Sequence, residues 1–451
     1  MGGPGAGPNG PGARALNGAP PPIAFREALR VWMRVALQSF GGPAGQIAVM
    51  HRIVVDEKRW VDESRFLHAL SFCTFLPGPE AQQLATYLGW SLHGTRGGLA
   101  AGALFVLPGF VAILALSIVY VTLGELPAVA ALLSGVKAAV VALVLEAAIR
   151  IGRRVLGGAL QRAVAVCAFA ALFLLGLPFP AVVAAAGAFG ALASWLWPER
   201  FAPPAADAVV APTSGPARHH LLRVVAIALP LWLAPSAACL LLLGPSDVFT
   251  RIGLFFSETA VVTFGGAYAV LAYVAQRAVE SYGWLSAREM LDGLGLAETT
   301  PGPLIMVVQF VGFVAAYRHA DVSSPLAAGV LASLLTTWVT FVPSFGFVLL
   351  GAPYVERLRR AARLAAALQM IMAAVVGVIA NLALWFALHV VFERVAPLEL
   401  AGLRLALPDW TSLDPKALLL SAAACLALLR FKAGLVATLV GSALAGLALR
   451  W

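Results

Sequence analysis

Long apolar runs, separated by short polar loops, fill most of this chain. Many of them extend for about 18 or more residues with almost no charge, which is the length that a helix needs to cross a bilayer. The pattern predicts an all-α polytopic membrane protein, because a transmembrane barrel would show shorter segments of alternating polarity. About thirteen transmembrane segments are expected, at 25–50, 66–92, 98–122, 127–150, 158–176, 178–197, 220–243, 248–279, 290–317, 325–350, 364–392, 416–430 and 433–449.

One pattern of glycine, proline and tryptophan occurs twice, at a constant spacing. A Phe-Gly-Gly at 40–42 recurs at 264–266, so the spacing is 224 residues (264 − 40 = 224). Trp60 and a Pro-Gly-Pro at 77–79 recur at the same spacing. In a duplicated membrane protein, glycine and proline breaks at matching places are typical of a secondary transporter, and they mark its binding site. The pattern therefore predicts two repeats with helices broken at the Gly-Gly and Pro-Gly-Pro motifs.

Loop charges orient the two copies, because Lys and Arg concentrate in cytoplasmic loops. The loop after the fourth segment is rich in arginine and lacks acids, whereas the equivalent loop of the second copy, 393–416, is mainly acidic. The preceding loops, 122–127 and 354–363, show the reverse bias. Matching loops of opposite bias indicate inverted-topology repeats. If segment 25–50 spans the membrane, the loop 51–65 lies outside; if the segment dips in and returns, that loop lies inside.

Composition divides the chain into five expected parts. The first 22 residues are mostly Gly, Pro, Ala and Asn and lack the apolar run of a signal peptide, which predicts a disordered tail. A Pro- and Ala-rich stretch separates the two copies, and one additional apolar segment follows it. The parts are the tail 1–22, a first repeat 23–197, a cytoplasmic linker 198–218, a topology-inverting helix 219–247 and a second repeat 248–451.

Overall composition supports the membrane class and excludes others. The chain has 451 residues, of which 61% are hydrophobic and only 12% charged, too few to cover the surface of a soluble protein. The net charge of +9 is explained by cytoplasmic Lys and Arg, so no nucleic acid partner is expected. The four cysteines show no metal-ligand spacing, and no nucleotide motif or nucleophile–base constellation is present. We therefore expect no cofactor, no metal and no enzymatic activity.

The glycine breaks carry the candidate chemistry. A broken helix in mid-membrane leaves backbone N–H groups without partners, and such groups at a helix N-terminus attract anions. Side chains near the breaks add polar groups and charge. The candidate substrate-binding residues are Arg34, Ser39, Gly41, Gly42, Gln46, Pro77, Gly78, Pro79, Glu80, Gln82, Gln83, Lys137, Thr263, Gly265, Gly266, Thr300, Pro301, Gly302, Pro303 and Gln309. The candidates for proton coupling are Glu80, Glu258 and Glu298.

Ionisable residues inside apolar segments are functional candidates, although each has a structural alternative. Lys137 lies in the middle of segment 127–150 and is either a cation for a negatively charged substrate or half of an ion pair. Arg34 and Glu258 occupy equivalent positions (258 − 34 = 224) and either serve function or pair across the pseudo-two-fold axis. Glu146 and Arg150, one helical turn apart, are expected to pair with each other.

Several motifs, taken in order, resemble the chromate ion transporter family of prokaryotes in its long two-domain form. The resemblance covers roughly 25–150 and 248–385, and it depends on the segments 39–48, 76–85, 135–141, 263–271 and 300–306. It implies a multi-pass protein of the cytoplasmic membrane that exports chromate and confers chromate resistance. Sulfate is the alternative oxyanion, with import as the alternative direction. Proton coupling and a homodimer remain open, as does the less favoured reading as a membrane assembly factor.

Overall fold

The computed structural model describes residues 23–201, 218–354, 361–400 and 403–449. The predicted tail 1–22, most of the linker 198–218 and most of the loop 354–363 lie outside the described residues. The first part of the chain forms α1 (Phe25–Gln38), α2 (Gly42–His51), the π-helix η1 (Arg52–Glu57), α3 (Glu63–Cys73), α4 (Glu80–Leu123), α5 (Pro127–Val155), α6 (Ala159–Phe173), α7 (Phe179–Leu196), η2 (Pro198–Arg200) and α8 (Arg218–Leu243).

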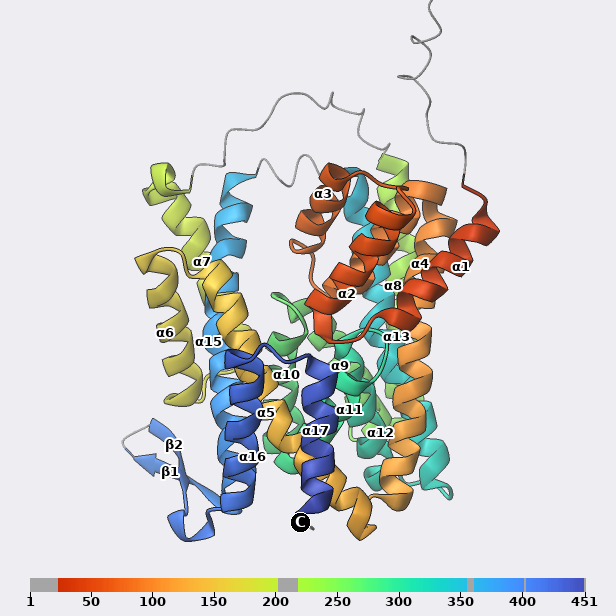
Figure 1. Cartoon of the computed structure of the whole chain (residues 1–451). Coiled ribbons are helices and arrows are strands. Elements are labelled where there is room, and N and C mark those ends of the chain that lie inside the picture. Colours follow the sequence, from red (N-terminus) through yellow and green to blue (C-terminus); the bar gives the residue numbers. More distant parts are fainter. Residues whose placement is uncertain (1–22, 202–217, 355–360, 401–402, 450–451) are drawn as a thin grey trace, which may run out of the picture.

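The second part of the chain is also mainly helical. It forms α9 (Val248–Val262), α10 (Ala267–Ala275), the π-helix η3 (Gln276–Ser281), α11 (Ala287–Thr299), η4 (Leu304–Met306), α12 (Val307–His319), α13 (Pro325–Gly351), η5 (Ala352–Tyr354), α15 (Ala362–Val391), β1 (Val395–Leu400), β2 (Leu403–Pro408), η6 (Trp410–Ser412), α16 (Pro415–Cys425), η7 (Leu426–Arg430) and α17 (Leu435–Ala448). The last two expected segments, 416–430 and 433–449, correspond to α16 with η7 and to α17, respectively (Figure 1).

Six helices among the described residues are long and apolar enough to cross a membrane, and three shorter apolar helices accompany them. The polytopic helical membrane class is therefore confirmed, whereas several of the expected segments are divided into shorter helices. The long α4 is itself divided, because His93 and Gly94 have non-helical backbone angles. Its two parts pack closely at Gly89, where a Cβ would lie 2.5 Å from the carbonyl oxygen of Gly97. The first part of α4 is thus a short helix that continues from the Pro-Gly-Pro break.

The helices break at the predicted motifs. α1 ends at Gln38 and α2 begins at Gly42, and the second copy is interrupted between Val262 and Ala267. Both glycines of each Phe-Gly-Gly have φ between +70° and +89°. An L-residue in this region costs about 1–2 kcal/mol, so glycine is the residue that permits the break. The Pro-Gly-Pro glycines also have positive φ.

The same local structures recur 224 residues apart. The π-helices η1 and η3 occupy equivalent positions (276 − 52 = 224). After each of them, the backbone N–H of a tryptophan donates to the backbone carbonyl six residues earlier, over 2.9 Å for Trp60 and 2.8 Å for Trp284. α3 and α11 then begin at equivalent residues, each with a side-chain cap, Asp62 in one and Ser286 in the other. The resemblance between the copies therefore extends to backbone hydrogen bonds.

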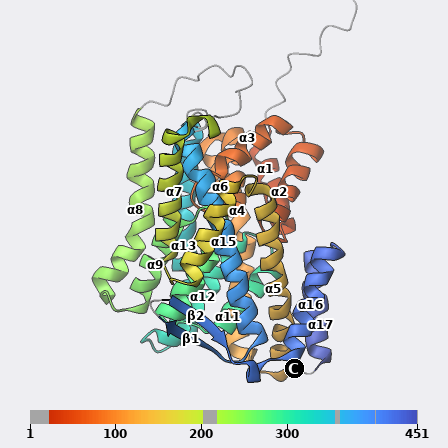
Figure 2. The same ribbon diagram turned by 90° about the vertical axis from the view of Figure 1, so that its left-hand side faces the viewer.

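α1 and α2 form a hairpin that returns to the side from which it starts. Gln38, Arg34 and Glu27 of α1 pair with Arg52, Glu57 and Lys58, respectively, so the chain after α2 runs back along α1. Figures 1 and 2 show α1, α2 and α3 together in the upper part of the molecule. In Figure 1, α10, α11 and α12 lie in the opposite part, towards β1 and β2, and Figure 2 shows the same for α11 and α12. This hairpin agrees with the alternative in which segment 25–50 dips in and returns.

A two-stranded hairpin was not foreseen. β1 and β2 pair antiparallel from Val395 with Pro408 to Leu400 with Leu403, inside the mainly acidic loop 393–416. Leucines alternate along both strands, at 398 and 400 and at 403, 405 and 407, which is the pattern of a half-buried strand. Because this segment is short and lies between long apolar helices, the apolar runs of its neighbours hid its strand pattern.

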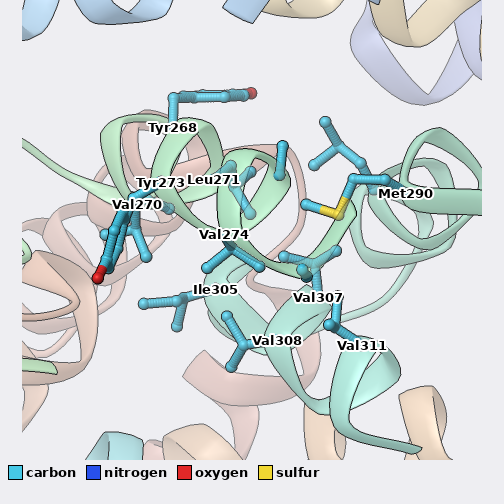
Figure 3. Packing of buried hydrophobic residues seen from close by; sticks show 14 of the residues in the cluster. Tyr268, Val270, Leu271, Tyr273, Val274, Met290, Ile305, Val307, Val308 and Val311 are labelled. Carbon is cyan, nitrogen blue, oxygen red and sulfur yellow. The ribbon is translucent and has the colours of Figure 1, made fainter. Parts of the chain in front are cut away.

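The broken segment of the second copy lies in the protein core. α10 is apolar on all sides, and its residues from Ala267 to Leu271 are all buried, as are Tyr273 and Val274. Figure 3 shows side chains of α10 packed against Ile305 and Val308 from the segment after the second Pro-Gly-Pro. Irregular backbone is tolerated at membrane depth only where protein or a wet cavity surrounds it. This packing surrounds the irregular backbone with protein. It also brings the second Phe-Gly-Gly close to the second Pro-Gly-Pro.

Candidate functional site

Two reciprocal backbone hydrogen bonds join the breaks of one copy to those of the other. The N–H of Gly78 donates to the carbonyl oxygen of Thr263 over 2.9 Å, and the N–H of Gly302 donates to that of Ser39 over 3.0 Å. These residues are equivalent in pairs, since 302 − 78 and 263 − 39 both equal 224. Each Pro-Gly-Pro therefore contacts the residue that precedes the Phe-Gly-Gly of the other copy. Such an exchange of equivalent contacts is the property of a two-fold arrangement.

A small cavity lies where the four breaks meet. Its volume is about 10 Å³, close to the smallest space that holds one water molecule. A tetrahedral oxyanion is larger than this cavity. Residues next to each of the four motifs line the cavity. They are Pro43, Gln46, Pro79, Glu80, Ala81, Gly266, Ala267, Pro303, Leu304 and Ile305.

Helix N-termini point to this cavity from three of the breaks. α2 begins at Gly42, α4 at Glu80 and α10 at Ala267, and none of the three has a side-chain cap. The first N–H groups of a helix have no intrahelical partner and carry partial positive charge. Uncapped N-termini beside one cavity are suited to bind an anion. The prediction from the glycine pattern, that the breaks present backbone donors, agrees with this geometry.

Two acidic side chains lie beside the Phe-Gly-Gly glycines. Glu298 is 1% exposed, and its Oε1 accepts a hydrogen bond of 2.6 Å from the Tyr268 hydroxyl. Its Oε2 has no hydrogen-bond partner among the described residues and would lie 3.9 Å from a Cβ at Gly42. On the other side, the Oε1 of Glu80 would lie 4.0 Å from a Cβ at Gly266. Each glycine pair thus faces a carboxyl group, and both carboxyls were candidates for proton coupling.

The glutamines near the breaks have different roles in the geometry. Gln46 lines the cavity, and its Nε2 donates to the carbonyl oxygen of Gly302 over 2.7 Å. Gln83 donates to the Pro77 carbonyl over 2.7 Å and braces its own loop. The other two candidates, Gln82 and Gln309, are bonded to Ser344 and Thr86 and to the Phe110 carbonyl, respectively, and are absent from the cavity lining.

The candidate hydroxyls are bonded within their own segments. Ser39 donates to the Val35 carbonyl over 2.7 Å, and Thr300 donates to the Ala297 carbonyl over 3.0 Å. Thr263 likewise donates to a carbonyl one turn earlier. For Ser39 and Thr263, the carbonyl oxygen rather than the hydroxyl joins the two copies, because it accepts a reciprocal bond. Gly41, Gly265 and Pro301 complete the turns of the motifs.

Lys137 forms an ion pair between the two halves of the chain. Its Nζ lies 3.3 Å from Oδ1 of Asp292 on α11, and the side chains are 18% and 5% exposed. The Tyr120 hydroxyl donates to the other carboxylate oxygen over 3.1 Å. Of the two roles considered for Lys137, the structure shows the ion pair. Sequence reasoning missed Asp292, although an acid inside the apolar segment 290–317 was a signal that could have identified it.

The pair considered between Arg34 and Glu258 is wrong. Arg34 is bonded to Glu57 over 2.7 Å, with its side chain 46% exposed, and Glu258 accepts a bond of 2.7 Å from the Tyr273 hydroxyl. The physical reason is the return of the chain after α2, which brings η1 beside α1 and supplies a closer partner. Neither residue lines the central cavity. The expected pair of Glu146 and Arg150 is confirmed at 3.6 Å.

Comparisons with known proteins agree with the resemblance carried by the motifs. The family model for chromate transporters matches residues 26–191 and 250–447. A chromate transport protein of Pseudomonas aeruginosa is 33% identical over 393 residues, which are 84% of this chain and 85% of that protein. A chromate transport protein of Cupriavidus metallidurans is 28% identical over 359 residues, covering 80% of this chain and 82% of the relative. No solved structure matches the chain significantly.

Proposed function

This chain belongs to the chromate transporter family, and from that premise we propose that it exports chromate through the point at which its four broken segments meet. The observation that carries the proposal is the pair of reciprocal hydrogen bonds, Gly78 to Thr263 and Gly302 to Ser39, around one small cavity. A dianion there would receive backbone donors from both copies. The residues proposed to hold it are those that line the cavity, with Gly41, Gly42, Gly265 and the two Pro-Gly-Pro glycines providing the turns.

The proposed architecture is two inverted repeats, 23–197 and 248–451, connected by a linker 198–218 and an inverting helix 219–247. Four observations support it. Equivalent local structures recur at a spacing of 224 residues, as η1 and η3 illustrate. The contacts between the copies are reciprocal. The broken segments of the copies, α1 with α2 and α9 with α10, lie in the upper and the lower part of Figure 1, respectively. Equivalent loops have opposite charge bias.

The proposed transport cycle alternates access to the cavity between the two sides of the cytoplasmic membrane. Because the cavity holds no more than about one water molecule, one copy has to move relative to the other before an oxyanion enters. Moving one elementary charge through 100 mV changes the free energy by about 2.3 kcal/mol. A dianion that leaves a negative cytoplasm therefore gains about 4.6 kcal/mol per 100 mV. Export needs no nucleotide under these conditions.

Proton coupling is a further part of the proposal, and the geometry favours two of its three candidates. Glu80 lines the cavity, and Glu298 is buried beside Gly42 with one carboxylate oxygen unpartnered among the described residues. Glu258 lies outside this centre, where it is bonded to Tyr273. A carboxylate near an anion site repels a dianion, and a neutral carboxyl does not. We therefore propose that Glu80 or Glu298 takes up a proton when the anion binds.

Transport into inside-out vesicles tests the proposal. Vesicles that contain the protein are expected to accumulate radiolabelled chromate, and vesicles without it are not. Gly42→Ala is expected to lose transport, because it changes the break beside Glu298. Gly283→Ala is the matched control: its φ of +62° is close to the +70° of Gly42, and it has open space around it. Equal transport by both variants would contradict the role of the break.

Sulfate in the same vesicles tests the alternative substrate. Chromate and sulfate are both tetrahedral dianions, and backbone donors suit either. Excess unlabelled sulfate that leaves chromate accumulation unchanged supports chromate as the substrate. If the vesicles accumulate sulfate faster than chromate, sulfate replaces chromate as the proposed substrate. If chromate accumulates only in right-side-out vesicles, the proposed direction changes from export to import.

A further inference from the structure

The central cavity has no full positive charge of its own. None of the described residues that line it is Lys, Arg or His, and its one charged side chain is that of Glu80. Two cations that the sequence suggested are held elsewhere, Lys137 by Asp292 and Arg34 by Glu57. Backbone donors at helix N-termini carry only partial charges. A full positive charge for a dianion therefore has to come from outside this cavity.

The hairpin of α16 and α17 ends inside the molecule, at the turn 430–434. α17 packs antiparallel to α5: a Cβ at Gly135 would meet the carbonyl oxygen of Ser442, and one at Gly446 would meet that of Ala131. From residue 442 back to the start of α17 there are 7 residues (442 − 435 = 7), or about 10 Å. From residue 135 to the end of α5 there are 20 residues (155 − 135 = 20), or about 30 Å. The turn thus stops about 20 Å short of the end of α5, and Figure 1 shows it at mid-height of the molecule.

Two cations lie in this turn, Arg430 and Lys432. Both are exposed, and neither forms an ion pair with a described residue. The hydrocarbon core of a bilayer is about 30 Å thick, so a turn about 20 Å from the end of a spanning helix lies at membrane depth. A charged side chain at that depth pairs with a partner or faces a water-filled space. Since no partner is described, we expect water to reach the turn.

Lys432 occupies a position that is glycine in the first copy. The corresponding turn is 174–178, because α6 and α7 pack on α15 as α16 and α17 pack on α5. Each turn has one residue with positive φ, +59° at Gly176 and +52° at Lys432. The N–H of the next residue then donates to a carbonyl six residues earlier, over 3.1 Å and 2.9 Å, respectively. Positive φ is unfavourable for a residue with a Cβ, so a lysine held in this geometry points to a role for its charge.

The turn 174–178 shows what such a turn encloses. Gly176 lines a cavity of about 490 Å³, together with residues of α10, α15 and the β1–β2 hairpin. α10 joins this outer cavity to the central one, because Ala272 lines the former and Ala267 the latter. None of the described residues that line the outer cavity is Lys or Arg. A helix-hairpin turn of one copy thus faces the broken segment of the other copy across a space that adjoins the centre.

The equivalent space lies between the turn 430–434 and α2. Figures 1 and 2 both show this turn just below the lower end of α2, where the first Phe-Gly-Gly lies. A Cβ at Gly41 would have nothing within 4 Å, whereas one at the equivalent Gly265 would lie 2.8 Å from Val375. Ala44 is exposed, whereas the equivalent Tyr268 is 4% exposed. The first break is therefore open where the second is covered.

We propose that Arg430 and Lys432 form an entry site, which captures the oxyanion from the cytoplasm beside the first Phe-Gly-Gly. From there the oxyanion passes to the backbone donors of α2, whose residues Pro43 and Gln46 line the central cavity. The outer cavity lacks Lys and Arg among its described lining residues, which favours release of the anion there. This inference depends on the proposed function, because it assigns the entry to the same site.

Lys432→Gly tests the charge while it suits the backbone, because glycine accepts positive φ. It is expected to keep the stability of the wild type and to raise the KM for chromate about fivefold in inside-out vesicles. Coulomb's law gives this factor for a unit charge and a dianion about 5 Å apart in water at physiological salt. Arg430→Gln is expected to act in the same direction, and Lys432→Arg to keep the wild-type KM.

Lys416→Gln is the matched control, since Lys416 is an exposed lysine at the opposite end of the same hairpin. Its KM is expected to equal that of the wild type. Equal KM values for Lys432→Gly and Lys416→Gln would overturn the entry site. If the wild type accumulates chromate in that case, the proposed function stands without it.

Labelling provides a readout that does not depend on transport. In a chain whose native cysteines are replaced, Lys432→Cys is expected to react with a membrane-impermeant maleimide in inside-out vesicles, and chromate is expected to slow the reaction. Leu419→Cys is the control, because Leu419 is 70% exposed on α16 and lipid is expected to cover it. No reaction of Lys432→Cys from the cytoplasmic side would contradict the inference. If the wild type accumulates no chromate, the proposed function fails, and the effect of chromate on labelling of the purified chain still decides whether the turn binds the oxyanion.

Discussion

The ion pair of Lys137 and Asp292 makes a quantitative prediction about what connects the two copies. Lys137 belongs to α5 and Asp292 to α11, and the two charges approach to 3.3 Å with little exposure. Removal of one partner from a buried pair leaves an uncompensated charge and costs about 3–5 kcal/mol. The 18% exposure of Lys137 favours the lower end of that range. We therefore expect Lys137→Met and Asp292→Asn each to lower the free energy of unfolding by about 3 kcal/mol.

The combined variant distinguishes a structural pair from a substrate ligand. Asn at position 292 retains an acceptor for the Tyr120 hydroxyl, and Met at position 137 fills the space of the lysine stem. Replacing both charges of a buried pair is often neutral, so we expect the double variant to recover at least about 2 kcal/mol of the loss. Steric-trapping measurements in bicelles provide the free energies of unfolding of the wild type, the two single variants and the double variant, which together form a double-mutant cycle.

Two results of this cycle bear on different claims. If the single variants are as stable as the wild type, or if their losses simply add in the double variant, the reasoning from the buried pair is refuted. If the double variant is stable and transports chromate with an unchanged KM, Lys137 is not a ligand of the substrate. A stable double variant without transport would return Lys137 to the substrate site, as its place in the middle of an apolar segment first suggested.

Three further predictions concern the breaks and their surroundings. Gly302→Ala is expected to cost about 2–5 kcal/mol in unfolding free energy, from positive φ and from a Cβ placed 3.0 Å from the backbone of α4. Gly41→Ala, which has open space, is expected to cost only about 1–2 kcal/mol, and equal losses would contradict this comparison. Glu298→Gln retains a partner for Tyr268 and is expected to flatten the pH dependence of transport; an unchanged pH profile would remove it from proton coupling. Arg34→Gln breaks only an exposed pair and is expected to change stability by less than about 1 kcal/mol, whereas loss of transport would place Arg34 at the site.

The breaks were predictable from the sequence because glycine and proline impose local backbone geometry. Positive φ at both Phe-Gly-Gly pairs follows from the absence of a Cβ, and no tertiary contact is needed to expect it. A constant spacing then identified equivalent residues before any contact was known. The expectation that the breaks form one site required only the further assumption that the copies are related by two-fold symmetry, which the reciprocal bonds of Gly78 and Gly302 support.

Partners of individual charges were not predictable, because they depend on how helices pack. Asp292 became the partner of Lys137 through the contact of α11 with α5, where Gly295 allows close approach to Val136. Arg34 found Glu57 because the chain turns back after α2, and a hydrophobic run alone does not distinguish a spanning segment from a returning one. The glutamines 82, 83 and 309 were assigned to the substrate by proximity in sequence. In the structure, Gln83 braces the Pro-Gly-Pro turn, whereas Gln82 and Gln309 are bonded to residues of the helices α4 and α13.

Sided labelling of equivalent residues tests the inverted arrangement most directly. Ser64 and Arg288 are equivalent (288 − 64 = 224), both are exposed, and they lie at the starts of α3 and α11. Single cysteines at these positions, in a chain whose four native cysteines are replaced, would be treated with a membrane-impermeant maleimide. The account predicts that Arg288→Cys reacts in intact cells and Ser64→Cys only in inside-out vesicles. Reaction of both cysteines from the same side would contradict it.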